Sequence, residues 1–107
     1  LLLRVLCNMV INALEASGPD EPVRLSLVNE TRHISFHVWN KQAMPDDIAR
    51  RIFQKNFSTK QESGRGFGTF SMKLFGEKVL GGKINFISSP GKGTTFTFTV
   101  PKAVTTD

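Results

Sequence analysis

A stripe of polar side chains in the first segment of the chain is the clearest candidate for chemistry. Arg4, Asn8, Asn12 and Glu15 recur at i, i+4, i+8 and i+11, which places them on one side of a helix. Asparagine is a poor helix former, and a buried amide without a partner costs about 1–3 kcal/mol. Because the other faces are almost entirely apolar, we expect this helix to be packed on most sides and its asparagines to serve a ligand or an ion. A polar edge that faces solvent or a neighbouring segment is the alternative.

A glycine-rich run is the second candidate. Gly64, Gly66 and Gly68 alternate in Gly-Arg-Gly-Phe-Gly just before a predicted helix, and Lys60 and Arg65 add positive charge beside them. Glycines let backbone N–H groups approach a ligand closely, and a helix N-terminus attracts anions. The run is neither a P-loop, because the spacing and the Lys-Ser/Thr pair are absent, nor a dinucleotide fingerprint. A flexible linker is the alternative interpretation.

Two further segments combine packing with possible ligand contacts. Phe53 and Phe57, four residues apart, indicate core packing, whereas Lys60 lies in a polar run where an ammonium could meet a phosphate. The segment 91–96 indicates a tight turn before the last strand, and Thr94 within it could contribute to a ligand pocket.

The elements that would position these residues follow from the hydrophobic pattern. A helix is predicted from Leu1 to about Ser17, and Gly18 and Pro19 end it. The strands are predicted over residues 23–29, 33–39, 83–89 and 94–100, in two hairpins. Two more helices are predicted over residues 45–55 and about 69–80. This order indicates an α+β fold with an antiparallel or mixed sheet.

Composition narrows the class of protein. The chain has 107 residues, 39% hydrophobic and 21% charged, which fits one globular domain. No apolar run approaches the ~20 residues that a membrane-spanning helix needs. The net charge of +5 is spread along the chain without a basic block. This distribution argues against nucleic acid as a partner and suits a small anionic ligand such as a nucleotide.

Cysteine and histidine add little. Cys7 stands alone, which excludes an internal disulfide, and we expect its thiol to be buried among apolar neighbours. His33 and His37 fall in the second predicted strand, without the helical and acidic surroundings of a phospho-acceptor. We therefore interpret both as ordinary strand residues.

Taken in order, these segments resemble the ATP-binding domain of sensor histidine kinases. That domain belongs to a group shared with DNA gyrase B, the heat-shock chaperone Hsp90 and the repair protein MutL. Residues 4–13 look like the N box of the family, 53–60 like its F box, 64–68 like its second glycine box and 91–96 like its third. The resemblance extends from Leu1 to about Pro101.

The resemblance implies a fold, ligands and site residues. The fold would be the Bergerat-type ATP-binding fold, a two-layer sandwich of a mixed, largely antiparallel sheet on helices, formed by residues 1–107 as one catalytic domain. Asn12 would be the Mg²⁺ ligand and Asn8 a phosphate-side partner, and Thr94 would lie near the base. The terminal phosphates and the lid would involve Lys60, Gly64, Arg65, Gly66 and Gly68.

One box departs from the family pattern. The family normally has Asp-x-Gly-x-Gly after the second strand, and its Asp accepts a hydrogen bond from the adenine amino group. Here the segment is Asn-Lys-Gln-Ala-Met, residues 40–44. Asn40 can still accept through its side-chain oxygen, but without charge, and Gln42 and Met44 replace both glycines.

The implied function is to position Mg-ATP for γ-phosphoryl transfer to a histidine on a helical hairpin outside this chain, and from there to a response regulator. We expect this chain to bind ATP without phosphorylating itself, and assign it no catalytic residue. The intact protein would be a cytoplasmic homodimer, or the cytosolic part of a membrane-bound sensor. The alternatives are a degenerate, non-catalytic signalling module and a gyrase- or Hsp90-type ATPase. Asn8 argues against the latter, because those enzymes place a Glu at that position.

Overall fold

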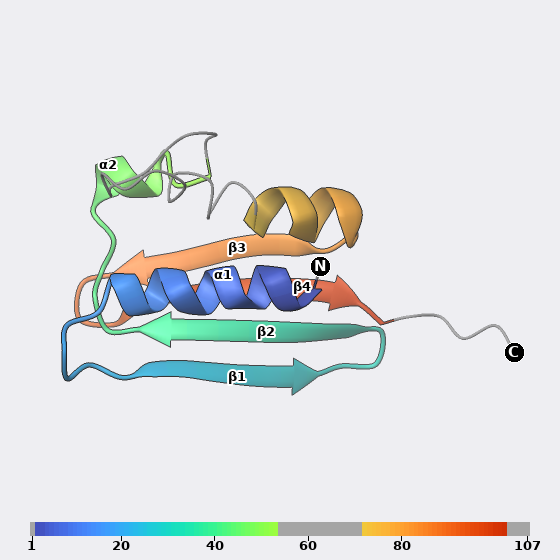
Figure 1. Ribbon diagram of the computed structural model, residues 1–107, viewed down its shortest axis with the longest axis horizontal. Coiled ribbons are helices and arrows are strands. Elements are labelled where there is room, and N and C mark those ends of the chain that lie inside the picture. The colour runs from blue at the N-terminus through green and yellow to red at the C-terminus, as the bar shows by residue number, and fades with distance from the viewer. Residues whose placement is uncertain (1, 54–71, 103–107) are drawn as a thin grey trace, which may run out of the picture.

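The computed structural model describes residues 2–53 and 72–102. The helices are α1 (Leu2–Glu15), the short α2 (Asp46–Ala49) and the π-helix η2 (Leu74–Val79). The strands are β1 (Val23–Asn29), β2 (His33–Asn40), β3 (Lys83–Ser89) and β4 (Gly93–Pro101) (Figure 1). None of the described helices is long and apolar enough to cross a membrane.

The strands form one sheet in the order β1-β2-β4-β3. Its three pairings are all antiparallel, and the first and last strand pairs are the two predicted hairpins. The strand predicted over residues 33–39 is confirmed as β2, and its apolar residues face the core: Phe36 and Val38 are buried, and Ile34 packs against the same core. At the far end of β2, Asn40 pairs with Thr94 of β4.

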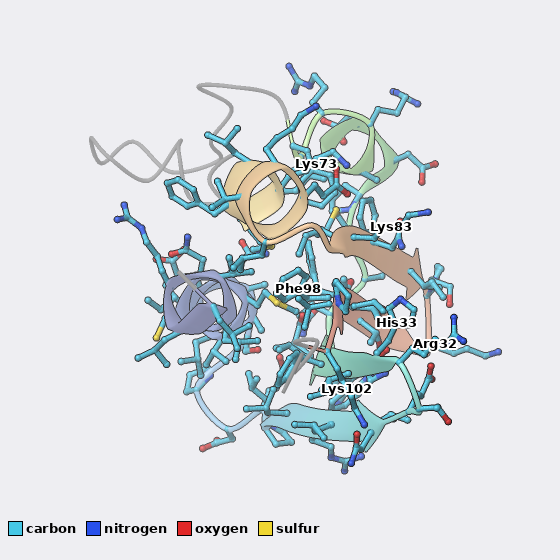
Figure 2. All side chains as sticks on the ribbon, turned by 90° about the vertical axis from the view of Figure 1, so that its right-hand side faces the viewer. Arg32, His33, Lys73, Lys83, Phe98 and Lys102 are labelled. Atoms are coloured by element: carbon cyan, nitrogen blue, oxygen red, sulfur yellow. The ribbon has the colours of Figure 1, made fainter. Side chains whose placement is uncertain are left out.

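The helices cover one face of this sheet. Figure 2 shows α1 and η2 on the same side, with the labelled Phe98 between them and the strands. The buried hydrophobic residues are Val5, Met9, Ala13, Phe36, Val38, Ile52, Met72, Ile84, Phe96 and Phe98. The expected two-layer α+β fold is therefore confirmed.

The opposite face of the sheet carries paired polar side chains. Ser35 and Thr99 pair through their hydroxyls at 3.1 Å, and His37 Nδ1 lies 3.1 Å from Thr97 Oγ1. His33 begins β2 and is exposed, at the strand end away from Asn40. Both histidines thus lie in a strand, as predicted, and His37 takes part in cross-strand pairing.

The prediction that the first helix is packed on most sides is wrong. Only Val5, Met9 and Ala13 of α1 are buried. Leu3 is 73% exposed, and Cys7, whose thiol we expected to be buried, is also exposed. The physical reason is that, in the described part of the chain, the sheet and η2 pack against α1 and leave its remaining surface exposed.

The two later helices differ from their predictions. α2 is much shorter than the predicted helix over residues 45–55, because the Arg51 N–H bonds back to Ile48 O at 3.0 Å and the chain continues as a turn. Within the helix predicted over residues 69–80, the structure describes residues from 72 onward, and Leu74–Val79 form a π-helix that ends with a Leu80 N–H bond to Phe75 O at 3.0 Å. Residues 54–71 lie outside the described part of the chain.

Glu77 ties η2 to the start of β3. Its Oε2 accepts hydrogen bonds from the Ile84 N–H at 3.1 Å and from Lys73 Nζ at 3.2 Å. Partial burial alone would raise the pKa of the Glu77 carboxyl, but these two donors outweigh it and leave the pKa below its ordinary value. The ionised carboxylate thus fastens the helix to the sheet.

The turn before β4 brings two backbones unusually close. Gly91 and Gly93 both have positive φ, 84° and 88°. A Cβ at Gly93 would overlap the carbonyl oxygen of Asn40, whereas a Cβ at Gly91 would meet nothing within 4 Å. Glycine at position 93 is therefore required by both conformation and space.

Alanine substitutions separate these two requirements. Gly91→Ala should lower the free energy of unfolding by about 1 kcal/mol, because an L-residue is disfavoured in the left-handed region. Gly93→Ala should lower it by roughly 3 kcal/mol, because the β2 backbone must also move. Chemical denaturation of both variants measures the difference, and equal losses would mean that the approach to Asn40 imposes no restraint.

Candidate functional site

A pocket of about 500 Å³ lies where β2 ends and β4 begins. The C-terminal part of α1 forms one side and the segment leading into α2 forms another. Its size falls within the range usual for small-molecule sites. The lining residues are Asn12, Ala16, Ser17, Gly18, Asn40, Gln42, Ala43, Met44, Pro45, Ile48, Ile52, Thr94 and Phe96.

The pocket brings together some of the predicted site residues and not others. Asn12 of α1, Asn40 of β2 and Thr94 of β4 all line it, although they are far apart in the sequence. Asn8 lies one helical turn before Asn12 and is half-buried, but it is not among the lining residues. The predicted residues Lys60, Gly64, Arg65, Gly66 and Gly68 lie outside the described part of the chain.

Among the described residues, the side-chain amides of Asn8 and Asn12 in the α1 stripe have no hydrogen-bond partner. Within residues 2–53 and 72–102, no hydrogen bond involves the side chain of Asn8 or Asn12, and no buried side-chain oxygen or nitrogen lacks a partner. Both amides are therefore open to solvent, and that of Asn12 opens towards the pocket. Arg4, at the start of the stripe, lies 5.2 Å above the ring of Phe75 in η2.

The Asn40 side chain has a defined orientation. Asn40 is only 3% exposed, and its Nδ2 donates to the Gln42 carbonyl oxygen at 3.4 Å. Among the described residues its Oδ1 has no partner, and no buried side-chain oxygen there is unsatisfied. Oδ1 is therefore accessible from the pocket that Asn40 lines, as an acceptor for an N–H donor.

The wall formed by residues 42–44 is anchored to the sheet by hydroxyl groups. Thr94 Oγ1 donates to the Gln42 carbonyl oxygen at 2.7 Å, and the Met44 N–H donates to Ser88 Oγ at 2.6 Å. The two hydroxyls are 2.8 Å apart. Ser88 was missed in the sequence, although one signal was present: it has the same strand parity as the core residues Ile84 and Phe86.

Glu21 anchors the same wall from outside. Its Oε2 accepts from Gln42 Nε2 at 2.7 Å, and its Oε1 accepts from the Gly18 N–H at 2.9 Å. These bonds, first that from Gln42 and then that from Gly18, hold the pKa of the Glu21 carboxyl below its ordinary value. A lowered pKa means that the bridge is complete above the ordinary carboxyl pKa and is lost as pH falls through the lowered value.

The Glu21 bridge predicts an observable titration. The Gly18 amide proton should shift with a midpoint below the ordinary range of a glutamate carboxyl, because protonation of Glu21 weakens the acceptor. Two-dimensional NMR across acidic pH measures this midpoint. Glu21→Gln should abolish the titration, and a midpoint at or above the ordinary range would contradict the bridge.

The sequence matches a known family along almost its whole length. The family is described as Histidine kinase-, DNA gyrase B-, and HSP90-like ATPase, and its model matches residues 1–104. The chain therefore belongs to this family, as its boxes led us to expect.

Sensor kinases are among the proteins similar to this chain. Adaptive-response sensory kinase SasA of Prochlorococcus marinus is 33% identical over 104 residues, covering 92% of this chain and 27% of SasA. Sensor histidine kinase DcuS of Escherichia coli is 37% identical over 103 residues, covering 94% of this chain and 19% of DcuS. The chain thus spans about a quarter or less of the length of these relatives.

Solved structures point to the same branch of the family. The catalytic domain of histidine kinase ThkA superimposes with a TM-score of 0.81 at 30% identity, covering 94% of this chain and 66% of that chain. ThkA in complex with the response regulator protein TrrA gives a TM-score of 0.75 at 27% identity, covering 95% of this chain and 28% of that chain. Within its family, the chain is accordingly a catalytic domain of the sensor histidine kinase type, and a gyrase- or Hsp90-type ATPase is not favoured.

Proposed function

We propose that the pocket binds ATP with Mg²⁺, and that the domain presents this nucleotide to a phospho-accepting histidine outside the chain. The observation that carries the proposal is the meeting of Asn12 and Asn40 in one pocket. These two amides supply oxygen acceptors from α1 and β2, one suited to a hard cation and the other to an amino group.

The adenine base fits the inner part of the pocket. Ile48, Ile52, Met44 and Phe96 offer apolar surface to a flat ring. The accessible Oδ1 of Asn40 would accept from the exocyclic amino group. The bond from its Nδ2 to the Gln42 carbonyl opposes a flip of the amide, because a flipped amide would place two oxygens face to face.

The phosphates would extend towards α1. The amide oxygen of Asn12 is a hard donor of the kind that Mg²⁺ accepts, alongside phosphate oxygens and water. We assign Asn8, Lys60, Arg65 and the glycines of residues 64–68 to the same end, on the basis of the family boxes. Bound Mg-ATP supplies the phosphoryl group, and the contribution of the chain is positioning and charge neutralisation.

The partners follow from the relatives. The structure of ThkA with TrrA joins a similar histidine kinase to a response regulator. We infer that this domain works within a longer, homodimeric sensor kinase whose acceptor histidine lies on a helical hairpin, with a response regulator as the final acceptor. We place the domain in the cytoplasm, where ATP is available.

Calorimetric titration with a non-hydrolysable ATP analogue tests the proposal. Wild-type protein should bind the analogue, and removal of Mg²⁺ should weaken binding by about tenfold or more, since the ion links the phosphates to Asn12. Asn12→Ala should remove this dependence on Mg²⁺ while leaving the fold intact, because its amide has no partner among the described residues. Asn85→Ala, at an exposed position of β3 outside the pocket lining, is the matched control and should leave binding unchanged. Absence of binding to folded wild-type protein at millimolar nucleotide would overturn the proposal.

The orientation of Asn40 predicts which base is preferred. Oδ1 can pair with the amino group of adenine but would oppose the carbonyl oxygen of guanine. Asn40→Leu, which keeps approximate size and removes the acceptor, should weaken the adenine analogue by about tenfold and affect the guanine analogue less. Competition binding with both analogues measures the ratio, and equal losses for the two bases would exclude base reading by Asn40.

A further inference from the structure

The wall of residues 42–44 is held in position by hydrogen bonds to the sheet. Gln42 and Met44 occupy positions where the family normally has glycines. Glycines would give the backbone the freedom to settle against a ligand. A short loop segment without the hydrogen bonds of a sheet or helix is more mobile than the elements it connects. Here the carbonyl of Gln42 and the N–H of Met44, two residues apart, are both bonded to side chains of the sheet.

The donor and acceptor of each hydrogen bond in this network follow from the groups involved. The Met44 N–H can only donate, so Ser88 Oγ accepts from it, and the Gln42 carbonyl can only accept, so Thr94 donates its one hydroxyl proton there. Thr94 then has no proton left for the 2.8 Å contact, so the Ser88 hydroxyl donates to Thr94 Oγ1. Each of the three donor protons, from the Met44 N–H and the two hydroxyls, therefore has one acceptor.

This arrangement changes what Thr94 can do. Thr94 is 3% exposed and could donate to a ligand only by releasing the Gln42 carbonyl. Ser88, opposite Thr94 in the register of β3 and β4, supports both Thr94 and the Met44 amide. The Ser88 hydroxyl therefore bonds directly to the Met44 end of the wall and, through Thr94, supports the Gln42 end.

We propose that Ser88 is a positioning residue of the nucleotide pocket, which acts with Thr94 to hold residues 42–44 as a fixed wall. The inference rests on the proposed function, because it concerns the same site. Ser88 itself is not among the pocket-lining residues, so its effect on a ligand passes through the wall. Without its hydroxyl, the Met44 N–H loses its acceptor and the wall must move or remain unpaired.

The sharpest test replaces Ser88 with two residues of equal shape. Ser88→Thr keeps the hydroxyl. Valine has the same shape as threonine but carries a methyl group in place of the hydroxyl. Ser88→Val should bind the ATP analogue about tenfold more weakly than wild type, which corresponds to ~1.4 kcal/mol. Ser88→Thr should restore affinity to within about twofold of wild type. The Met44 amide should exchange with solvent faster in the valine variant alone, with or without nucleotide.

A second hydroxyl pair in the same sheet provides the control for general destabilisation. Ser35 and Thr99 pair at 3.1 Å on the opposite face, outside the pocket lining. Thr99→Val removes that pair and should leave analogue affinity within about twofold of wild type. If wild type and Ser88→Val bind equally while binding still depends on Asn12, the inference is overturned and the proposed function stands. If folded wild type does not bind, both are overturned.

Discussion

Gly93 passes so close to the carbonyl oxygen of Asn40 that β4 can begin against β2 at this point only with a glycine. The register of the central strands follows, with Asn40 opposite Thr94 and Thr94 opposite Ser88. These three polar side chains therefore stand in a row across the sheet at the edge of the pocket. A slip of one residue would turn all of them to the opposite face and replace them with their neighbours. The pocket thus depends on backbone contact before it depends on any side chain.

The pocket wall shows how a site can be held without the glycines that its family normally uses there. Gln42 is held from outside by Glu21, and its carbonyl is held from beneath by Thr94. Met44 is held by Ser88. Side-chain hydrogen bonds therefore fix this segment. The departure from the family pattern at residues 40–44 is therefore compatible with a formed pocket.

The parts of the fold that could be predicted are those governed by local rules. The hydrophobic pattern predicted the strand over residues 33–39 that forms β2, and the segment 91–96 predicted the turn before the last strand. The surroundings of α1 could not be predicted, because a helix sequence does not reveal how many layers will pack on it. Leu3 and Cys7 are exposed for that reason. The short α2 and the π winding of η2 likewise depend on tertiary contacts.

The candidate site was predictable to a similar degree. Asn12, Asn40 and Thr94 were chosen from the sequence, and the structure brings them into one pocket. The role of each residue depends on the hydrogen bonds around it, and these depend on distances between strands. Ser88 carried a signal in its strand parity, but Glu21 carried none, because a loop carboxylate has no pattern that points to Gln42. Hydrogen bonds between side chains of different loops therefore could not be predicted from the sequence.

Adjacent residues of a strand point to opposite faces, so the neighbour of Asn40 is on the outside of the sheet. That neighbour is Trp39, the only tryptophan of the chain. Its indole Nε1 donates to the Lys92 carbonyl oxygen at 2.8 Å, and the Arg24 guanidinium lies 4.9 Å above its ring. The indole is thus hydrogen-bonded to the turn that carries Gly93, on the face of the sheet opposite the pocket. A change in the pocket wall would alter the surroundings of this indole, so the protein contains its own emission probe, with no label needed.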